Sequence, residues 1–227
     1  MSSKQGKDGS PARLPRGPHG LPREEIAHNQ RQRLLAAMVQ VCGTKGYEAT
    51  SVADILEVSG VGRETFYELF DDKRDCFLAA HDLLVENLIT QVRAAYGSGD
   101  APWPQRIRAA LARLLEWLAT EPNAARFTVL EMAATGPGYA ERFQQFFHLF
   151  TELLDDGREL SPTARDLPQI SNIAATAIFA RIYEEIALGR ASELPNLLPT
   201  LTFEVLAPFL GEGLARDEAG GADQAAA

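Results

Sequence analysis

A short segment around residue 63 combines side chains that can hydrogen-bond to phosphates and to the edges of bases. Arg63 carries a planar guanidinium, which can pair in a bidentate manner with O6 and N7 of guanine. Thr65 and Ser51 carry hydroxyls that can hydrogen-bond to phosphate oxygens. For Glu64 two alternatives are open: its carboxylate accepts from N4 of cytosine, or, as an anion near phosphates, it only pairs with Arg63. These side chains are candidates for contact with a DNA duplex.

Two short helices joined by a tight turn would position these side chains. Ser51 precedes an apolar run and Asp54 follows three residues later, so a capping box predicts a helix that begins just after Ser51. Ser59-Gly60 ends this helix, because glycine adopts the left-handed conformation without steric cost. A second helix is expected at about residues 62–69. This pattern is that of a helix-turn-helix unit, whose second helix enters the major groove, but a plain helical hairpin fits the pattern equally well.

The order of residues from position 46 to position 73 is more specific than the helical pattern. Its members are Gly46-Tyr47, Thr50-Ser51-Val52, Asp54-Ile55, Gly60-Val61, Thr65-Phe66-Tyr67, Phe70 and Lys73. This arrangement resembles the N-terminal domain of the TetR family of bacterial transcription regulators. The family's motif covers roughly residues 31–80, and the remaining chain matches the family only in length and helical character. The resemblance implies a DNA-binding regulator, with repression as the default.

The resemblance also implies roles for two further residues. Tyr67 and Lys73 match positions that contact phosphates in the family. Gly62 stands where the family often has Ser or Thr as a cap, and Leu69 stands where many members have His or another polar residue. One helix cap is therefore expected to be weaker, and one phosphate contact is in question. The expected DNA-binding residues are Ser51, Arg63, Glu64, Thr65, Tyr67 and Lys73.

Charge is distributed unevenly along the chain. The 227 residues are 45% apolar, which is enough for a buried core, and carry a net charge of −9. Residues 1–75 hold 11 basic and 11 acidic side chains, whereas residues 76–227 hold 11 basic and 20 acidic ones. Because phosphates repel an acidic body, the N-terminal part is the only plausible face for docking to DNA.

Several other classes of protein are not indicated. No serine-hydrolase, P-loop, zinc-protease or dinucleotide-binding motif is present in the sequence, so we expect no enzyme and no cofactor. Cys42 and Cys76 lie far apart without paired histidines, and His148 has no neighbour at ligand spacing, so no metal site is predicted. No run of 18 apolar residues and no signal peptide occurs, so we expect a soluble, cytoplasmic protein with no membrane partner.

Helical periodicity extends through the chain, and no alternating strand pattern appears. We therefore predict an all-α fold of about nine helices: an N-terminal three-helix DNA-binding domain and a C-terminal helical domain for ligand binding and dimerisation. The expected parts are 1–21, a disordered basic arm; 22–72, the helix-turn-helix domain; 73–213, the effector and dimerisation domain; and 214–227, a disordered tail. The arm could follow phosphates or enter a minor groove, or merely keep the chain in solution.

The C-terminal helices carry two further candidate sites. Aromatic side chains at helical spacing more often indicate ordinary core packing, but the resemblance implies that a cavity for a small apolar or aromatic effector lies within the C-terminal helices. Its expected lining is Trp117, Arg126, Phe127, Glu131, Phe143, Phe147, Phe179 and Tyr183. Alanine-rich and leucine-rich stretches favour a homodimer interface, with intrachain core as the alternative; the residues are Ile173, Ala177, Leu201 and Val205.

Two functions from different classes remain open at this stage. The first is a dimeric regulator that binds a palindromic operator in double-stranded DNA and is released by its effector. The second is a helical adaptor that binds a protein partner through the apolar helix expected at residues 73–96. Only the first predicts affinity for a duplex that falls steeply with salt concentration.

Overall fold

The chain folds into helices and their connecting turns. The computed structural model describes residues 22–97, 100–136, 139–167 and 169–220, and within these residues it contains no strand. They form eleven α-helices and three 3₁₀ helices, so the all-α prediction is confirmed and the predicted number of nine helices is too low. The chain divides into two compact units, residues 1–83 and 84–227, and the division falls within one long helix.

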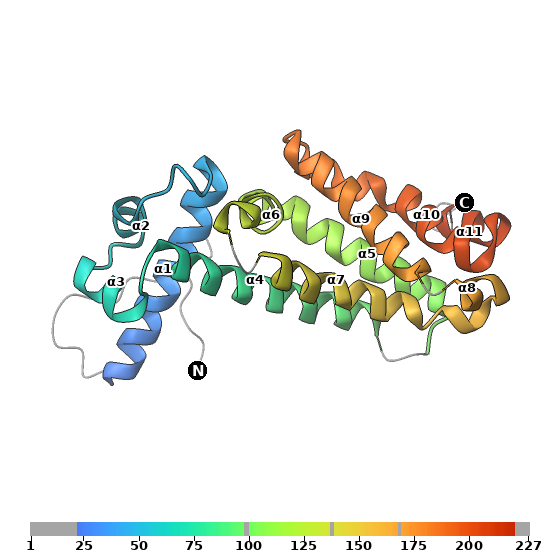
Figure 1. Cartoon of the computed structure of the whole chain (residues 1–227), viewed down its shortest axis with the longest axis horizontal. Helices are drawn as coiled ribbons and strands as arrows, with labels where there is room; N and C mark the ends of the chain where they lie inside the picture. The colour runs from blue at the N-terminus through green and yellow to red at the C-terminus, as the bar shows by residue number, and fades with distance from the viewer. Residues whose placement is uncertain (1–21, 98–99, 137–138, 168, 221–227) are drawn as a thin grey trace, which may run out of the picture. The chain divides into compact units, whose positions relative to one another are not determined.

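The first unit consists of three helices and the beginning of a fourth, labelled in Figure 1. They are α1 (Arg23–Lys45), α2 (Val52–Ser59), α3 (Arg63–Leu69) and α4 (Lys73–Tyr96). The bounds of α2, α3 and α4 agree with the sequence prediction to within about one residue. The core consists of large apolar side chains from all four helices, including Leu34, Leu35, Met38, Ile55, Phe66 and Phe77. Burial of these side chains holds α2 and α3 against α1.

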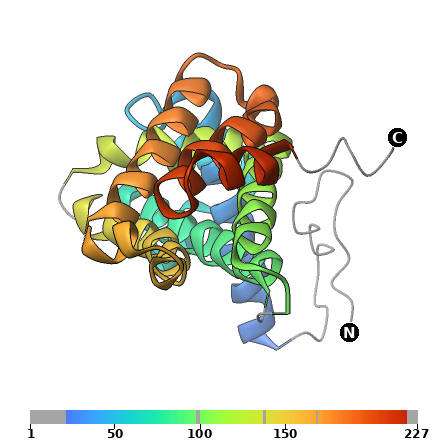
Figure 2. The same cartoon turned by 90° about the vertical axis from the view of Figure 1, so that its right-hand side faces the viewer.

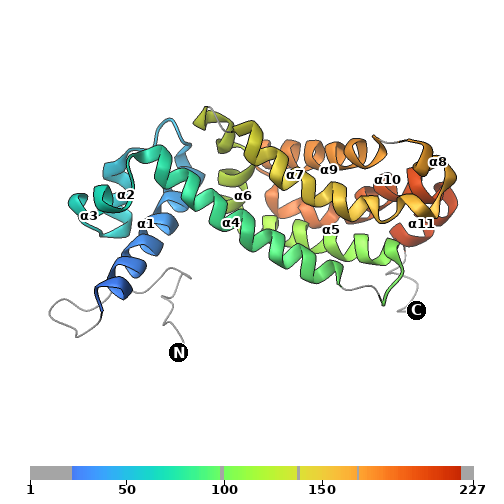
Figure 3. The same cartoon turned by 60° about the horizontal axis from the view of Figure 1, so that its bottom comes forward.

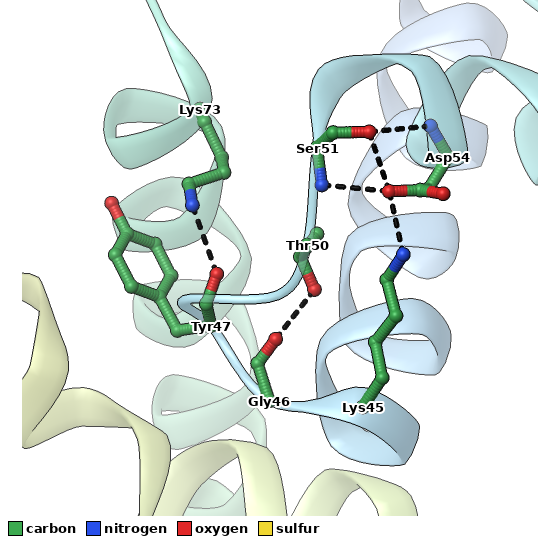
Figure 4. Close-up of polar contacts among 7 residues, drawn as sticks. All are labelled: Lys45, Gly46, Tyr47, Thr50, Ser51, Asp54 and Lys73. Carbon is green, nitrogen blue, oxygen red and sulfur yellow. Dashed lines mark hydrogen bonds and ion pairs between the residues drawn. The ribbon is translucent and has the colours of Figure 1, made fainter.

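The N-terminus of α2 is held by the predicted capping box, drawn in Figure 4. The backbone N–H of Asp54 donates to Oγ of Ser51 (3.3 Å), and the backbone N–H of Ser51 donates to Oδ2 of Asp54 (2.7 Å). Thr50 is buried just before the cap, and its hydroxyl donates to the carbonyl of Gly46 (2.7 Å). The start of α2 and the loop before it are therefore fixed by side chains that lie close in sequence.

A salt bridge connects this cap to the end of α1. The ammonium of Lys45 lies 2.7 Å from Oδ2 of Asp54 (Figure 4). The hydrogen bonds from Lys45 and Ser51 hold the pKa of Asp54 well below its usual range. A carboxyl with a lowered pKa stabilises the fold above its unfolded-state pKa of about 3.9, and this contribution is lost as the pH falls further. Because both side chains are partly exposed, the salt bridge is a modest contribution that orients α2 on α1.

The second unit is built from the rest of α4 and the helices that follow it. They are α5 (Trp103–Thr120), α6 (Pro122–Val129), η1 (Glu131–Thr135), α7 (Tyr139–Asp155), η2 (Arg158–Leu160), α8 (Pro162–Asp166), α9 (Ile170–Ala187), η3 (Ala191–Leu197), α10 (Leu198–Leu210) and α11 (Glu212–Gly220). The helix α7 packs along α9, as Figure 3 shows, and α10 packs on α5, α9 and α11. Figure 2 views this unit from the side on which α11 lies, in red.

Two of these helices were not predicted. Residues 214–220, expected in a disordered tail, form most of α11, whose Ala215 and Ala219 are buried one helical turn apart. The short helix α8, before Pro168, begins with a Ser161 cap and a proline in its first turn. Small alanines carry little hydrophobic signal, which explains the first omission. None of the helices within the described residues is both long and apolar enough to traverse a lipid bilayer.

Aromatic side chains pack where the end of α7 meets the start of α5. The indole N–H of Trp103 donates to the carbonyl of Leu153 (2.9 Å), and the hydroxyl of Tyr96 donates to Oδ2 of Asp156 (2.6 Å). Burial raises the pKa of Tyr96, and the hydrogen bond to Asp156 raises it further. The backbone of Gly157 passes so close to Trp103 that a Cβ there would lie 2.2 Å from the indole ring. This contact brings the end of α7 against the start of α5.

Removal of the hydroxyl of Ser51 should weaken the first unit. Ser51→Ala leaves the N–H of Asp54 without its cap, and we expect the free energy of unfolding to fall by about 1 kcal/mol. Chemical denaturation at neutral pH measures this change. Ser51→Thr is the matched control, because it retains a hydroxyl at the cap, and it should stay within a few tenths of a kcal/mol of the parent. Equal losses for both variants would contradict the role assigned to the cap.

A methyl group at position 157 should destabilise the second unit. In Gly157→Ala the new Cβ would overlap the Trp103 ring, and we expect a loss of about 1–3 kcal/mol in the free energy of unfolding. Gly213→Ala provides the control, because a Cβ at Gly213 meets no atom within 4 Å and alanine favours the helix α11. Thermal unfolding followed by circular dichroism distinguishes them. A Gly157→Ala protein as stable as the Gly213→Ala protein would show that the ring can move aside.

Candidate nucleic-acid interface

The turn between α2 and α3 has the geometry of a helix-turn-helix unit. Gly60 adopts the left-handed conformation (φ 62°, ψ 26°), and its N–H donates to the carbonyl of Leu56 (2.8 Å), which ends α2. Val61 is buried in the corner, and Oγ of Ser59 accepts from its N–H (3.2 Å). The guanidinium of Arg33, on α1, donates to the carbonyl of Ser59. The direction in which α3 leaves the turn is therefore fixed by contacts from two helices.

The position of Phe66 determines which side chains α3 exposes. Phe66 has no exposed surface and packs against the rings of Phe70 (5.6 Å between centroids) and Tyr67 (5.2 Å). Arg63, Glu64, Tyr67 and Glu68 are exposed, whereas Thr65 and Leu69 are half-buried. The expected sequence-reading residues Arg63 and Glu64 are therefore accessible, and so is the phenol of Tyr67. The first turn of α3 has no side-chain cap, as Gly62 predicted.

Arg63 is supported by an aromatic ring rather than by a carboxylate. Its guanidinium lies over the ring of Tyr67, 5.6 Å from the centroid. Within the described residues no ion pair joins Arg63 to Glu64, so one of the two alternatives for Glu64 is not realised. A planar guanidinium held against a ring keeps its donors free at the edge, which is the arrangement required for bidentate contact with guanine.

Lys73 and Ser51 have partners inside the protein. The ammonium of Lys73 donates to the carbonyl of Tyr47 (2.9 Å) and lies 4.1 Å from the centroid of the Tyr47 ring, as Figure 4 shows. Tyr47 itself is buried against Phe77, and burial raises the pKa of its phenol. Lys73 is only half-buried, and its ammonium has two further donors, whereas the hydroxyl of Ser51 is committed to the cap of α2. Contact of these two residues with phosphate stays a prediction.

Three charged residues of the first unit were not singled out in the sequence analysis. Arg33 and Lys45 lie on α1 and contact Ser59 and Asp54 of α2. Arg33 and Ser59 are 26 residues apart, and no local sequence pattern indicates a contact over such a separation. Glu68 lies on the exposed surface of α3 together with Glu64. Its place could have been deduced from helical periodicity once Phe66 was assigned to the core.

Both cysteines belong to the core of the first unit. Cys42 and Cys76 have no exposed surface. Burial raises the pKa of Cys76 to about 12, so its thiol remains protonated at neutral pH. Buried, protonated thiols are poor nucleophiles, so these residues act in packing.

The predicted effector residues fall into two groups in the second unit. Phe143 on α7 packs edge-on against Phe179 on α9, with 4.7 Å between ring centroids. Phe147 stacks on Phe143 (5.7 Å), and Tyr183 lies beside Phe179 (6.1 Å), which extends the row in both directions. Tyr183 is exposed and the three phenylalanines are half-buried. This aromatic row between α7 and α9 is accessible along part of its length.

The other predicted effector residues lie on α5, α6 and η1. Trp117 and Phe127 are buried, and α6 packs against α5 and α9. The guanidinium of Arg126 lies 3.2 Å from a carboxylate oxygen of Glu131, and the Arg126 side chain is about half exposed. Trp117 and Phe127 therefore belong to the core, while Arg126 is the accessible cation of the set.

The predicted dimer residues face in opposite directions. Ile173 on α9 is 68% exposed and Ala177 is half-buried, whereas Leu201 and Val205 on α10 are buried within the chain itself. Periodicity identified the apolar face of α10 but not what it packs against. Ile173 and Ala177 are therefore accessible to a second subunit, whereas Leu201 and Val205 are not.

Comparisons with known proteins agree with the helix-turn-helix geometry. Residues 34–80 match the family described as bacterial regulatory proteins, tetR family. An uncharacterized HTH-type transcriptional regulator in the lacX 3' region of Lactococcus lactis subsp. lactis is 24% identical over 186 residues, covering 78% of this chain and 91% of that protein. The HTH-type transcriptional activator FasR of Mycolicibacterium smegmatis is 27% identical over 136 residues, 60% of each chain.

Solved structures share the fold at low sequence identity. The fatty acid degradation regulator FadR from Bacillus halodurans is 18% identical, with a TM-score of 0.69 over 79% of this chain and 94% of that one. The transcriptional regulator FadR from Bacillus subtilis, in complex with stearoyl-CoA, is 18% identical, with a TM-score of 0.65 over 79% of this chain and 97% of that one.

The geometry, the family match and the relatives lead to the same assignment. The matched family and the relative from Lactococcus lactis are both described as regulators, and neither is described as an enzyme. The exposed α3, the turn at Gly60 and the family match together identify residues 34–80 as a helix-turn-helix domain of the kind found in the tetR family of bacterial regulatory proteins.

Proposed function

We propose that this chain acts in the cytoplasm as a homodimeric repressor that binds a palindromic operator through α3 and leaves it when an effector with a long apolar chain binds. The observation that carries the proposal is the orientation of α3: Phe66 is buried, and Arg63 and Tyr67 point outward from the same short helix. The match of residues 34–80 to the tetR family of bacterial regulatory proteins supports this proposal over the alternative, a helical adaptor without DNA function.

The proposed DNA contacts are of two kinds: contacts with bases, which select the sequence, and contacts with phosphates, which position the helix. Arg63, held over the ring of Tyr67, is the side chain proposed to read guanine. Tyr67 and Thr65, and the remaining donors of Lys73, are proposed to bind phosphates, which fixes the position of the helix without selecting a sequence. The basic residues of segment 1–21, which lies outside the described residues, could add phosphate contacts of the same kind.

A single copy of α3 has seven residues and spans few base pairs, so a second copy is needed for a specific site. Support for a homodimer comes from the solvent-facing side of α9, where Ile173 is largely exposed among small residues such as Ala177 and Ala180. Small side chains permit close approach of a partner helix. Two-fold symmetry would place two copies of α3 about 34 Å apart along one side of the duplex.

The proposed effector combines an apolar chain with an anionic group. Support for the chain comes from the aromatic row formed by Phe143, Phe147 and Phe179, which is half-buried and accessible beside Tyr183. Arg126 offers a partly exposed guanidinium for the anion, and FadR from Bacillus subtilis was solved with stearoyl-CoA. We therefore propose a long-chain acyl thioester of coenzyme A. Because the relative FasR is described as an activator, activation is the alternative sign of regulation.

Loss of the Arg63 side chain should remove sequence discrimination. The operator is first recovered from a randomised duplex library, where it should appear as an inverted repeat. Arg63→Ala should then weaken operator binding roughly 5- to 150-fold, while binding to random duplex changes much less, because guanine pairing is lost and most phosphate contacts remain. Fluorescence anisotropy with labelled duplexes measures both affinities.

Lys73→Ala is the matched control for this comparison. It removes one charge that is proposed to contact phosphate, so it should weaken operator and random duplex by the same factor. Circular dichroism checks that the variant stays folded, because Lys73 also binds the carbonyl of Tyr47. Equal losses on both duplexes for Arg63→Ala would reject a base-reading role for Arg63.

Addition of a long-chain acyl thioester should release the operator. We expect stearoyl-CoA to raise the dissociation constant of the operator complex at least about fivefold, in the usual range of coupling between two sites. Coenzyme A without an acyl chain is the control and should have no effect. Phe179→Ala, which interrupts the aromatic row at its centre, should raise the concentration of stearoyl-CoA needed for half release about tenfold. Release by stearoyl-CoA with unchanged potency in this variant would place the effector elsewhere.

A further inference from the structure

The most outward-facing side chains of α3 are two carboxylates. An α-helix turns about 100° per residue, so residues two positions before and two positions after an inward-facing residue lie on the opposite side. Phe66 is the fully buried residue of α3, and Glu64 and Glu68 are both exposed. The outer ridge of the helix proposed to enter the major groove is therefore acidic.

The helix accounts for Glu64 but not for Glu68. Glu64 lies in the first turn of α3, where the positive end of the helix dipole favours an anion. The exposed Glu68 lies in the last turn of α3, where the negative end of the helix dipole disfavours an anion. Like charges four residues apart also destabilise a helix. Neither carboxylate takes part in an ion pair or hydrogen bond within the described residues, whereas Asp54 and Asp72 both cap helices. Glu68 is thus placed at a cost to α3, and both carboxylates are exposed and available to an external donor.

Only two groups in the major groove can donate to a carboxylate. They are N4 of cytosine and N6 of adenine, and in adenine the acceptor N7 lies beside the donor and repels an anion. Cytosine is the better partner, since it presents a donor without an adjacent acceptor on the same base. Residues four apart on a helix are separated by about 6 Å along its axis, close to the rise of two base steps, about 6.8 Å.

We propose that Glu64 and Glu68 are specificity-determining residues that accept hydrogen bonds from cytosine N4 groups about two base steps apart in each half-site. Duplexes without these donors gain no hydrogen bond and leave two carboxylates facing acceptors and phosphates, so they are rejected. Arg63, displaced to the flank of the helix over Tyr67, reads guanine beside them. The proposal rests on the proposed function, because it assumes that α3 enters the groove.

The test compares the motifs selected by two proteins from one randomised duplex library. The parent chain should enrich an inverted repeat with cytosine at two positions of each half-site. The double variant Glu64→Gln/Glu68→Gln should keep the guanine preference attributed to Arg63 and lose the preference for these cytosines. Replacing one such C·G base pair by T·A puts the acceptor O4 of thymine in place of the N4 donor. This change should weaken binding of the parent roughly 5- to 150-fold and should weaken binding of the double variant less than about threefold.

A matched variant separates base reading from simple charge. Glu57→Gln removes one exposed carboxylate from α2 instead of α3. It should raise affinity for operator and random duplex together and leave the selected motif unchanged. The double variant should instead raise affinity for random duplex while binding the parent's operator no more tightly.

The outcomes distinguish this inference from the proposed function. If the parent enriches no sequence, the proposed function fails, and the assignment of Glu64 and Glu68 fails with it. If the parent enriches an inverted repeat without a cytosine preference, or the double variant retains that preference, the roles of Glu64 and Glu68 are rejected and the DNA-binding function stands. Circular dichroism of the double variant should show an unchanged helical content, because both side chains are exposed.

Discussion

The burial of Phe66 is the constraint on which the surface of the recognition helix depends. A seven-residue helix with one fully buried aromatic side chain can rotate little about its axis without exposing that ring. The rotation of α3 in turn decides that Arg63 lies on a flank and Glu64 on the outer ridge. The supporting contacts of Arg33 with Ser59, and of Lys45 with Asp54, fix the neighbouring helix and turn. Core packing and groove-facing chemistry are therefore set by the same side chain.

Local signals in the sequence predicted the first unit well. The capping box of Ser51 and Asp54, the left-handed Gly60 and the aromatic spacing around Phe66 each act over about four residues, so their geometry can be deduced from the sequence. The contacts made by Arg33 and Lys45 were not predicted, because nothing in a periodic pattern identifies which residue of a distant helix lies opposite. The exposure of Arg63, Glu64 and Tyr67 could thus be predicted from the sequence, whereas the contacts that support the turn could not.

The second unit was less predictable, for a related reason. Periodicity shows that a helix has an apolar face but does not show whether a neighbouring helix or a second chain covers it. Leu201 and Val205 were assigned to a dimer interface and are buried in their own chain, whereas Ile173 is open to a partner. The helix α11 was missed, because Ala215 and Ala219 bury little area each and give a weak signal.

Electrostatics explain why a recognition helix with an acidic ridge can serve a regulator. Residues 22–83 hold 7 basic and 11 acidic side chains, so this part of the chain has little general attraction for phosphate. Some of its acids are used within the fold: Asp72 accepts from the N–H of Asp75, and Asp75 from that of Asp71. When non-specific binding is weak, the many competing sites of a chromosome hold little of the protein. A modest gain in binding free energy from contacts with the correct bases is then enough for preferential binding at the operator. Under the proposed function, low net attraction for phosphate and selective contact with bases would both favour binding at the operator over binding elsewhere.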